Sequence, residues 1–177
     1  KADGAVGASD KASGGSAAEG VGAGWDVAVE HGSLVDGLKV FAGYSEIEQV
    51  ATTAGYAGDR TQEVLGATYA VGGVTFGYQY SKDNLNMKSG TDAYENTAYG
   101  VSFSVNDDLS ISYGVHESEA IVLAATNVTN EGESLQVSYT MGGATFIIAE
   151  SSVKNQDYVS TTTYDRDGTT VVLSLAF

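Results

Sequence analysis

The sequence contains no cysteine and no proline among its 177 residues. The lack of cysteine excludes disulfide bonds and thiolate metal sites. Basic residues are scarce, since 8 Lys and Arg stand against 23 Asp and Glu, for a formal net charge of −15. Binding to a phosphate backbone needs a basic surface, so we do not expect nucleic acid to be a partner.

Long apolar runs are also absent, because no stretch approaches the roughly 18 to 20 apolar residues that a membrane-spanning helix needs. Hydropathy alone would therefore class the chain as soluble. That conclusion does not extend to transmembrane β-barrels, whose strands carry a much weaker hydrophobic signal per segment.

What the sequence does contain is a sustained alternation of apolar and polar residues from about residue 21 to the end. Such a period of two predicts β-strands with one apolar and one polar face, and a helical period of 3.6 fits none of the segments. Residues 1–20 are small, polar and aperiodic, which predicts a loop or tail. We therefore expect one all-β unit over residues 21–177.

Nine alternating segments can be followed along the chain, and two kinds of connection join them in turn. The short connections are Gly72-Gly73, Asn106-Asp107-Asp108, Gly142-Gly143 and a slightly longer link near 32–36. The long connections are expected at about 49–60, 83–93, 119–131 and 153–167. Short and long connections in alternation predict an up-and-down antiparallel meander with its tight turns along one edge.

Two architectures could use this pattern, and they differ in the direction of the apolar face. A soluble sandwich or barrel turns it inward, whereas a membrane barrel turns it toward lipid. Three features favour the membrane barrel. Aromatic residues gather near strand ends, the polar face is mostly Gly, Ala, Ser and Thr, and long connections lie opposite tight turns. We therefore predict an antiparallel transmembrane β-barrel, with a soluble acidic β-domain as the alternative.

Several stretches resemble the C-terminal half of the general diffusion porins of alphaproteobacteria. They are "NDDLSISYGV", "AYGVSFSV", "TTVVLSLAF" and the Gly-Gly hairpins, and the resemblance covers roughly residues 21–177. It implies a homotrimeric channel in the bacterial outer membrane, in contact with lipid and lipopolysaccharide. It also implies a barrel of about sixteen strands, in which the terminal Phe177 resembles the signal that the barrel-assembly machinery recognises.

Nine strands cannot close an antiparallel barrel, because the first and last strands would run in the same direction. We therefore expect the chain to be part of a longer barrel, with residues 1–20 as an extracellular loop. A small self-contained barrel of eight or ten strands, acting as an anchor or adhesin, is the competing hypothesis. It would require one segment to be misassigned, or one further strand within residues 1–20.

The expected function is passive diffusion of small hydrophilic solutes and ions through a water-filled channel, with no enzymatic step and no cofactor. His31 and His116 have no partners at metal-ligand spacing, and no nucleophile motif occurs. The side chains predicted to line the pore are Asp26, Glu30, Lys39, Gln79, Ser102, Ser112, His116, Gln136 and Ser138.

The acidic excess predicts a mild preference for cations, because carboxylates at a channel mouth concentrate cations. The acidic residues expected in the long connections are Asp59, Asp83, Asp92, Glu131, Asp157, Asp165 and Asp167. Solvation of the surface, with divalent ions bridging to lipopolysaccharide, explains the same residues equally well.

Overall fold

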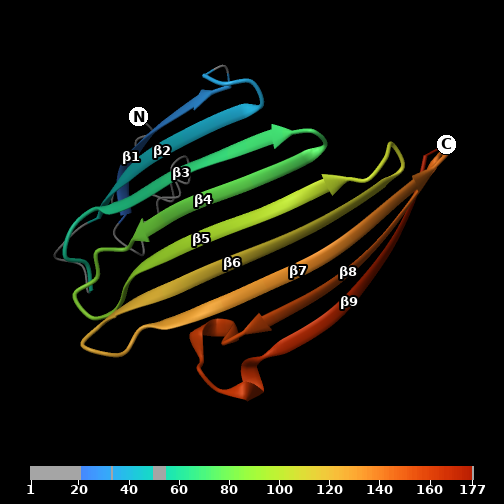
Figure 1. Cartoon of the computed structure of the whole chain (residues 1–177). Helices are drawn as coiled ribbons and strands as arrows, with labels where there is room; N and C mark the ends of the chain where they lie inside the picture. Colours follow the sequence, from blue (N-terminus) through green and yellow to red (C-terminus); the bar gives the residue numbers. More distant parts are fainter. Residues whose placement is uncertain (1–20, 33, 50–54, 177) are drawn as a thin grey trace.

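A computed structural model describes residues 21–32, 34–49 and 55–176, which form one antiparallel β-sheet (Figure 1). Across this part of the chain, each strand pairs with the next one in sequence. The strands are β1 (Val21–His31), β2 (Leu38–Gln49), β3 (Arg60–Val71), β4 (Val74–Asn84), β5 (Gly90–Ser104), β6 (Leu109–Leu123), β7 (Val128–Met141), β8 (Ala144–Lys154) and β9 (Arg166–Leu175). The predicted all-β meander is confirmed, whereas residues 1–20 and Phe177 lie outside the described residues.

Helical structure is confined to two short 3-10 turns in the residues that the structure describes. They are η2 (Gln156–Tyr158) and η3 (Thr162–Tyr164), and both lie in the connection between β8 and β9. Within the described ranges, no helix has the length and the apolar character needed to cross a membrane.

The tight turns lie along one edge of the sheet, as predicted (Figure 1). Gly72 and Gly73 join β3 to β4 with φ angles of 56° and 84°, which a two-residue hairpin of this kind requires. Between β5 and β6, the side-chain oxygen of Asn106 accepts hydrogen bonds from the N–H groups of Asp108 and Leu109, at 2.9 and 2.8 Å. Local turn chemistry therefore sets these connections.

At the opposite edge the strands run further than the hydrophobic alternation predicts. The expected connection 119–131 shrinks to 124–127, and the expected connection 83–93 shrinks to 85–89. The prediction of a long connection was therefore wrong in both places. In these extensions both faces carry polar side chains, so the alternation ends while backbone pairing continues. The connections that remain long are 50–59 and 155–165.

Cross-strand register assigns the strand residues to two faces. Apolar residues pair with apolar residues across the sheet, as where Val27 lies opposite Tyr44 and Ile111 lies opposite Val137. We call this the apolar face, and its central residues are Val27, Val40, Leu65, Phe76, Val101, Ile111, Val137, Ile148 and Val171. The residues that alternate with them form the polar face.

The sheet has no packed core in the described part of the chain. The buried residues there are Ala23, Ala93, Ala120 and Ser118, and none of the large side chains is fully buried. Large apolar side chains of the apolar face are instead exposed, including Val27 at 50% and Leu173 at 62%. The apolar residues of this chain therefore do not pack against one another across two layers.

Within the described residues the sheet is open, with β1 at one edge and β9 at the other. Direction reverses at each step of an antiparallel meander, so β1 and β9 run in the same direction. Along β7 the apolar-face residues are exposed and the polar-face residues are half-buried. This difference is what a curved sheet produces when its apolar face is convex, and the fold is consistent with part of a β-barrel.

Candidate functional site: the polar face of the sheet

The side chains that the sequence singled out all lie on the polar face. They are Asp26, Glu30, Lys39, Gln79, Ser102, Ser112, His116, Gln136 and Ser138. Register brings three of them into one row, since Ser102 lies opposite Ser112, which lies opposite Gln136. Lys39 and Glu30 form an ion pair, with 2.8 Å between Nζ and Oε2.

The remaining predicted residues are not brought into the same cluster. Gln79 and His116 each lie opposite Ala98, on either side of β5. Ser138 lies opposite Ser110, closer to the tight turns. These residues are spread along the polar face and do not converge on one point, and their assignment to a pore wall stays a prediction.

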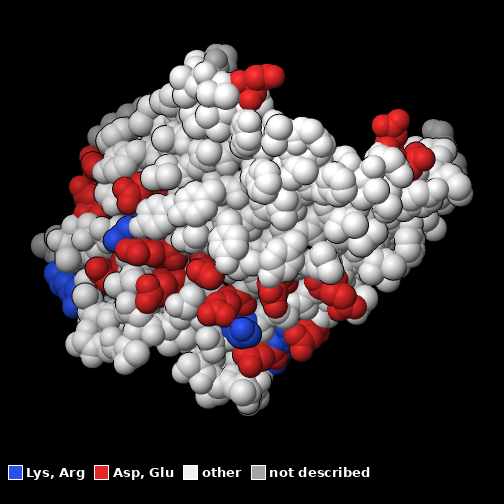
Figure 2. Space-filling view, in the orientation of Figure 1, with Lys and Arg blue, Asp and Glu red and all other residues white. Residues whose placement is uncertain are grey.

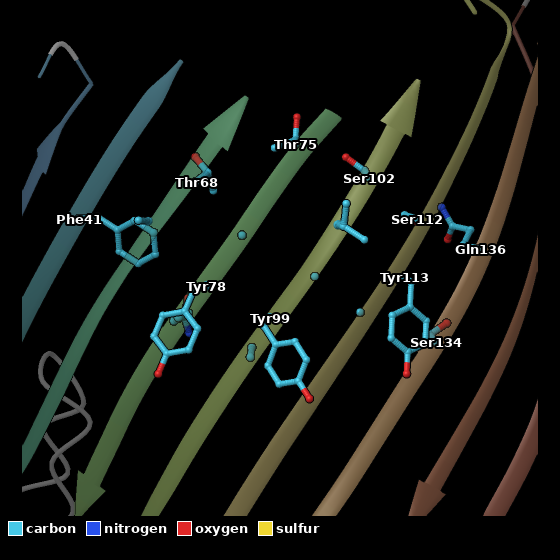
Figure 3. A pocket seen from close by; sticks show the side chains of 17 residues that line it. Phe41, Thr68, Thr75, Tyr78, Tyr99, Ser102, Ser112, Tyr113, Ser134 and Gln136 are labelled. Atoms are coloured by element: carbon cyan, nitrogen blue, oxygen red, sulfur yellow. The ribbon is translucent and has the colours of Figure 1, made fainter. Parts of the chain in front are cut away.

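An open depression of about 550 Å³ lies over the polar face in the middle of the sheet (Figure 3). Gly77 lies opposite Gly100, which lies opposite Gly114, so three neighbouring strands lack side chains here. The polar-face side chains around this floor are those of Phe41, Thr68, Thr75, Gln79, Ser102, Ser112, Ser134 and Gln136, whereas Tyr78, Tyr99 and Tyr113 of the same lining belong to the apolar face. Glycine with short polar side chains leaves room for water and for small solutes.

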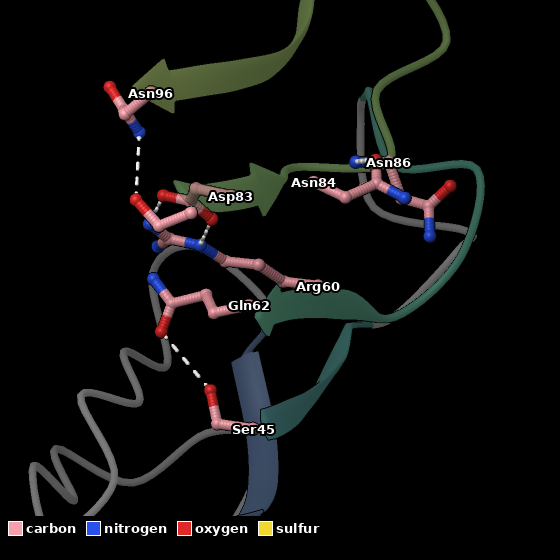
Figure 4. A network of polar contacts seen from close by, with 8 residues as sticks. Ser45, Arg60, Gln62, Asp83, Asn84, Asn86 and Asn96 are labelled. Atoms are coloured by element: carbon pink, nitrogen blue, oxygen red, sulfur yellow. Dashed lines mark hydrogen bonds and ion pairs between the residues drawn. The ribbon is translucent and has the colours of Figure 1, made fainter. Parts of the chain in front are cut away.

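A row of hydrogen-bonded polar side chains crosses the same face nearer the long connections (Figure 4). We call it the polar belt, and its members are Ser45, Arg60, Gln62, Ser81, Asp83, Asn96 and Ser118. The hydroxyl of Ser45 donates to Gln62 Oε1 at 3.1 Å, and the amide of Asn96 donates to Ser81 Oγ at 3.4 Å. The belt therefore continues from β2 to β6.

Arg60 and Asp83 form the charged pair of the belt. The guanidinium donates two hydrogen bonds to the carboxylate, from Nε at 2.8 Å and from Nη2 at 2.5 Å. Both side chains are less than half exposed, at 35% and 23%. The expectation that Asp83 lies in an acidic connection was wrong, because it lies in β4 with a cation against it.

Sequence reasoning missed the polar belt because the belt lies in the strand extensions. Around Gln62, Asp83, Asn96 and Ser118 the residues on both faces are polar or charged, so no hydrophobic period marks a strand there. The extensions become visible only through backbone pairing with neighbouring strands. A signal was nonetheless present, because polar residues recur at every second position before each expected connection.

The apolar face also changes character near the long connections, where it becomes acidic (Figure 2). We call this region the acidic band, and its carboxylates are Glu46, Glu63, Glu95, Glu117, Glu119, Glu131, Glu133, Glu150 and Asp167. Lys82 and Lys154 are the cations among them, paired with Glu95 at 2.7 Å and with Glu131 at 3.4 Å. Glu131 and Asp167 lie in β7 and β9, and Asp92 lies in β5, so the expectation that these three residues lie in connections was wrong.

Tyrosines on the apolar face lie directly beside the acidic band and bond to it. The hydroxyl of Tyr113 donates to Glu133 Oε2 at 2.5 Å, and the hydroxyl of Tyr44 donates to Glu46 Oε2 at 3.2 Å. Trp25 and Tyr44 also contact each other, with ring centroids 5.3 Å apart. Amphipathic rings thus separate the apolar part of this face from its charged part.

Charges on the polar face of the strands balance. The acidic side chains there are Asp26, Glu30 and Asp83, and the basic ones are Lys39, Arg60 and Arg166. The large negative charge of the chain therefore lies mainly in the acidic band and in the connections. Within the described ranges, no three His, Asp or Glu side chains come together in an arrangement that could hold a metal ion.

Comparison with models of known protein families gives no match for this chain. Comparison with curated proteins likewise gives no relative. The functional argument therefore rests on the two faces of the sheet and on the side chains that they carry.

Proposed function

We propose that the chain is part of a porin-type β-barrel of the bacterial outer membrane, through which small hydrophilic solutes and ions diffuse passively. The supporting observation is the apolar face, where large side chains lie exposed on every strand of the sheet except β2, whose apolar side chains are half-buried. Soluble proteins rarely expose a contiguous apolar surface of this extent. Contact with lipid gives these side chains the environment that the sheet itself does not supply.

The polar face supports the channel half of the proposal. Its floor of Gly77, Gly100 and Gly114 and its surrounding hydroxyl groups leave space for water and offer hydrogen bonds to passing solutes. Transport of this kind needs no covalent step and no coupled energy source. Selection among solutes then depends on channel diameter and on wall charge.

Closure of the barrel requires additional strands in this proposal. Because β1 and β9 run in the same direction, an antiparallel barrel can close only if an odd number of further strands joins β9 back to β1. A sixteen-stranded barrel meets this condition, since 16 − 9 = 7 strands would complete it. A homotrimer, lipopolysaccharide against the acidic band and recognition of Phe177 by the assembly machinery belong to the same proposal.

Ion selectivity in such a channel should be weaker than the net charge of −15 implies. The polar-face charges of the strands balance, so acidic residues of the connections, such as Asp157, provide the cation preference. Reversal potentials across bilayers in a salt gradient measure this directly. A preference for anions would contradict it.

Two measurements on the protein extracted from its native membrane test the proposal. Incorporation into planar lipid bilayers should give discrete ohmic conductance steps, and the intact mass should exceed that of these 177 residues. An absence of conductance from folded, membrane-inserted protein would favour an anchor or adhesin. Full solubility without detergent would favour a soluble β-domain.

The nine predicted segments match the nine strands of the described residues one for one. A small eight-stranded barrel would require one of these segments not to be a strand, and all nine are strands in the described residues. A ten-stranded barrel would require a strand within residues 1–20, which lie outside the described residues.

A further inference from the structure

The connection between β8 and β9, residues 155–165, is attached to the polar face by a side chain that reaches across the sheet. The hydroxyl of Tyr158 lies 2.7 Å from Oγ of Ser118, in β6. Its ring lies beside that of Tyr94, in β5, with centroids 5.2 Å apart. Both partners are polar-face residues, since Ser118 lies opposite Asn96, and Tyr94 lies opposite Ala120.

The partners of Tyr158 are among the least accessible parts of the sheet. Ser118 is 6% exposed and also donates from Oγ to Oδ1 of Asn96, at 2.5 Å. Ala120, two residues further along the polar face of β6, is 4% exposed. The polar face is otherwise half-buried or exposed in the middle of the sheet, so the contact with Tyr158 accounts for the low exposure of Ser118.

The reach of the connection follows from the spacing of the strands. The connection leaves the sheet from β8, packs against β7 and contacts β6 and β5 through Tyr158. Three spacings separate β8 from β5, which corresponds to about 14 Å across the polar face. The connection therefore lies against β7, and its Tyr158 side chain extends across the polar face to β6 and β5 at the long-loop end.

The base of the connection is also held in place. Nδ2 of Asn155 donates to the carbonyl of Thr129 at 2.8 Å, and the N–H of Asn155 donates to Oδ1 of Asp165 at 3.0 Å. Asn155, Asp157 and Tyr158 all have positive φ angles, of 54°, 57° and 58°. A bulky residue such as tyrosine adopts this backbone region only when surrounding contacts compensate for the strain.

We propose that residues 155–165 form a strap that narrows the channel mouth from the side of β8, and that Tyr158 is the latch that holds the strap against β5 and β6. The narrowing rests on the proposed channel function, whereas the latch rests only on the contacts of Tyr158. Releasing the latch would leave the base of the strap in place and open the polar face beneath it. The strap thereby sets the upper size limit for hydrophilic solutes.

The latch can be tested by cysteine accessibility, because these 177 residues contain no cysteine. An Ala120→Cys variant places a single thiol on the polar face opposite Tyr94, whose ring Tyr158 contacts, and Ser134→Cys places one on the open polar face. A charged methanethiosulfonate reagent should label Cys at 120 slowly and Cys at 134 quickly. Adding Tyr158→Ala should speed labelling at 120 about tenfold, which corresponds to about 1.4 kcal/mol in the opening equilibrium.

Matched variants separate the latch from general loosening of the connection. Tyr158→Ala keeps the strained φ angle and removes the hydroxyl and the ring, whereas Tyr158→Phe removes only the hydroxyl and should give a smaller acceleration. Tyr164→Ala removes an exposed tyrosine from the same connection and should leave the labelling rate unchanged. Equal labelling of positions 120 and 134 with Tyr158 present, or no effect of Tyr158→Ala, would overturn the latch.

Planar-bilayer recordings of the cysteine-free variants test the narrowing separately. Tyr158→Ala should raise the single-channel conductance and admit larger neutral polyethylene glycols, while Tyr164→Ala should not. Channels with unchanged conductance and an unchanged size limit would overturn the narrowing. If no variant conducts although labelling responds to Tyr158, the channel function and the narrowing both fail, and the latch contact is retained.

Discussion

The two ends of the sheet are stabilised in different ways. At the tight-turn end, turns such as Gly72-Gly73 connect the strands, and side-chain bonds are local to a hairpin, as in the ion pair of Lys39 with Glu30. At the long-loop end, side-chain bonds cross from strand to strand on both faces, as between Arg60 and Asp83 and between Tyr113 and Glu133. Backbone turns therefore contribute most to the tight-turn end, and bonds between polar side chains contribute most to the long-loop end.

The comparison indicates where the apolar face should tolerate a substitution that introduces a charge and where it should not. In the middle of the sheet the apolar face carries aliphatic side chains such as those of Val101, Ile111 and Val137, which offer no carboxylate to an introduced cation. Near the long connections the acidic band already presents carboxylates to water or to lipid head groups. The proposed membrane environment would explain the contrast, because the middle of this face would lie in hydrocarbon and its long-loop end at an interface.

The largest expected effect comes from placing an arginine in the middle of the apolar face and another at its long-loop end. Val137→Arg should lower the free energy of unfolding by about 2 to 4 kcal/mol in lipid, whereas Glu117→Arg in the acidic band should cost about 0 to 1 kcal/mol. Denaturant titration in phospholipid vesicles measures both, with Trp25, the single tryptophan of the chain, as the fluorescent probe. Equal costs at the two positions would contradict the proposed depth of the face in the membrane.

A second, smaller effect distinguishes the backbone of the two ends. Gly37, in the β1–β2 connection, and Gly90, at the start of β5, have nearly equal φ angles of 77° and 76°. Alanine at Gly90 meets no atom within 4 Å, so it should cost only about 1 kcal/mol for the left-handed backbone.

At Gly37 an added Cβ would overlap the carbonyl oxygen of Ala70. The N–H of Ala70 donates to the carbonyl of Gly37 at 2.9 Å, so the two segments cannot separate without losing that bond. Gly37→Ala should therefore cost about 2 to 3 kcal/mol, measured by the same titration. If Gly37→Ala lowered the free energy of unfolding no more than Gly90→Ala does, the tight-turn end would not be the more constrained end of the sheet.

The smallest expected effect compares two ion pairs at the long-loop end, one on each face. Double-mutant cycles with Arg60→Met and Asp83→Asn should give a coupling energy of about 1 to 2 kcal/mol, because the guanidinium binds the carboxylate through two hydrogen bonds. Cycles with Lys82→Met and Glu95→Gln should give about 0.5 kcal/mol. Added salt should weaken the second coupling more, and the reverse order would contradict the role of the polar belt.

The fold was predictable from the sequence where the hydrophobic alternation is strong. Segments such as 99–105 and 109–116 alternate cleanly, and the turn between them contains Asn106, whose side chain caps the backbone. Both signals are local, so they can be read without knowing the partner strand. Every residue predicted for the polar face lies there for the same reason.

The rest depended on pairing between distant residues. Strand extensions such as 117–123 contain polar residues on both faces, and backbone pairing with β5 and β7 is what continues the strand. The contact between Ser118 and Tyr158 joins residues 40 positions apart. No local pattern around Tyr158 distinguishes it from Tyr164 in the same connection.

By itself, the sequence determined the strand period, the order of the tight turns and the division of residues between two faces. Those properties follow from alternation and from turn chemistry, which act over a few residues. Only the tertiary structure decided that the acidic excess lies largely on the apolar face, that Arg60 compensates Asp83, and that residues 155–165 lie over the polar face. Register and long-range contact produce these features, and both depend on which strands lie side by side.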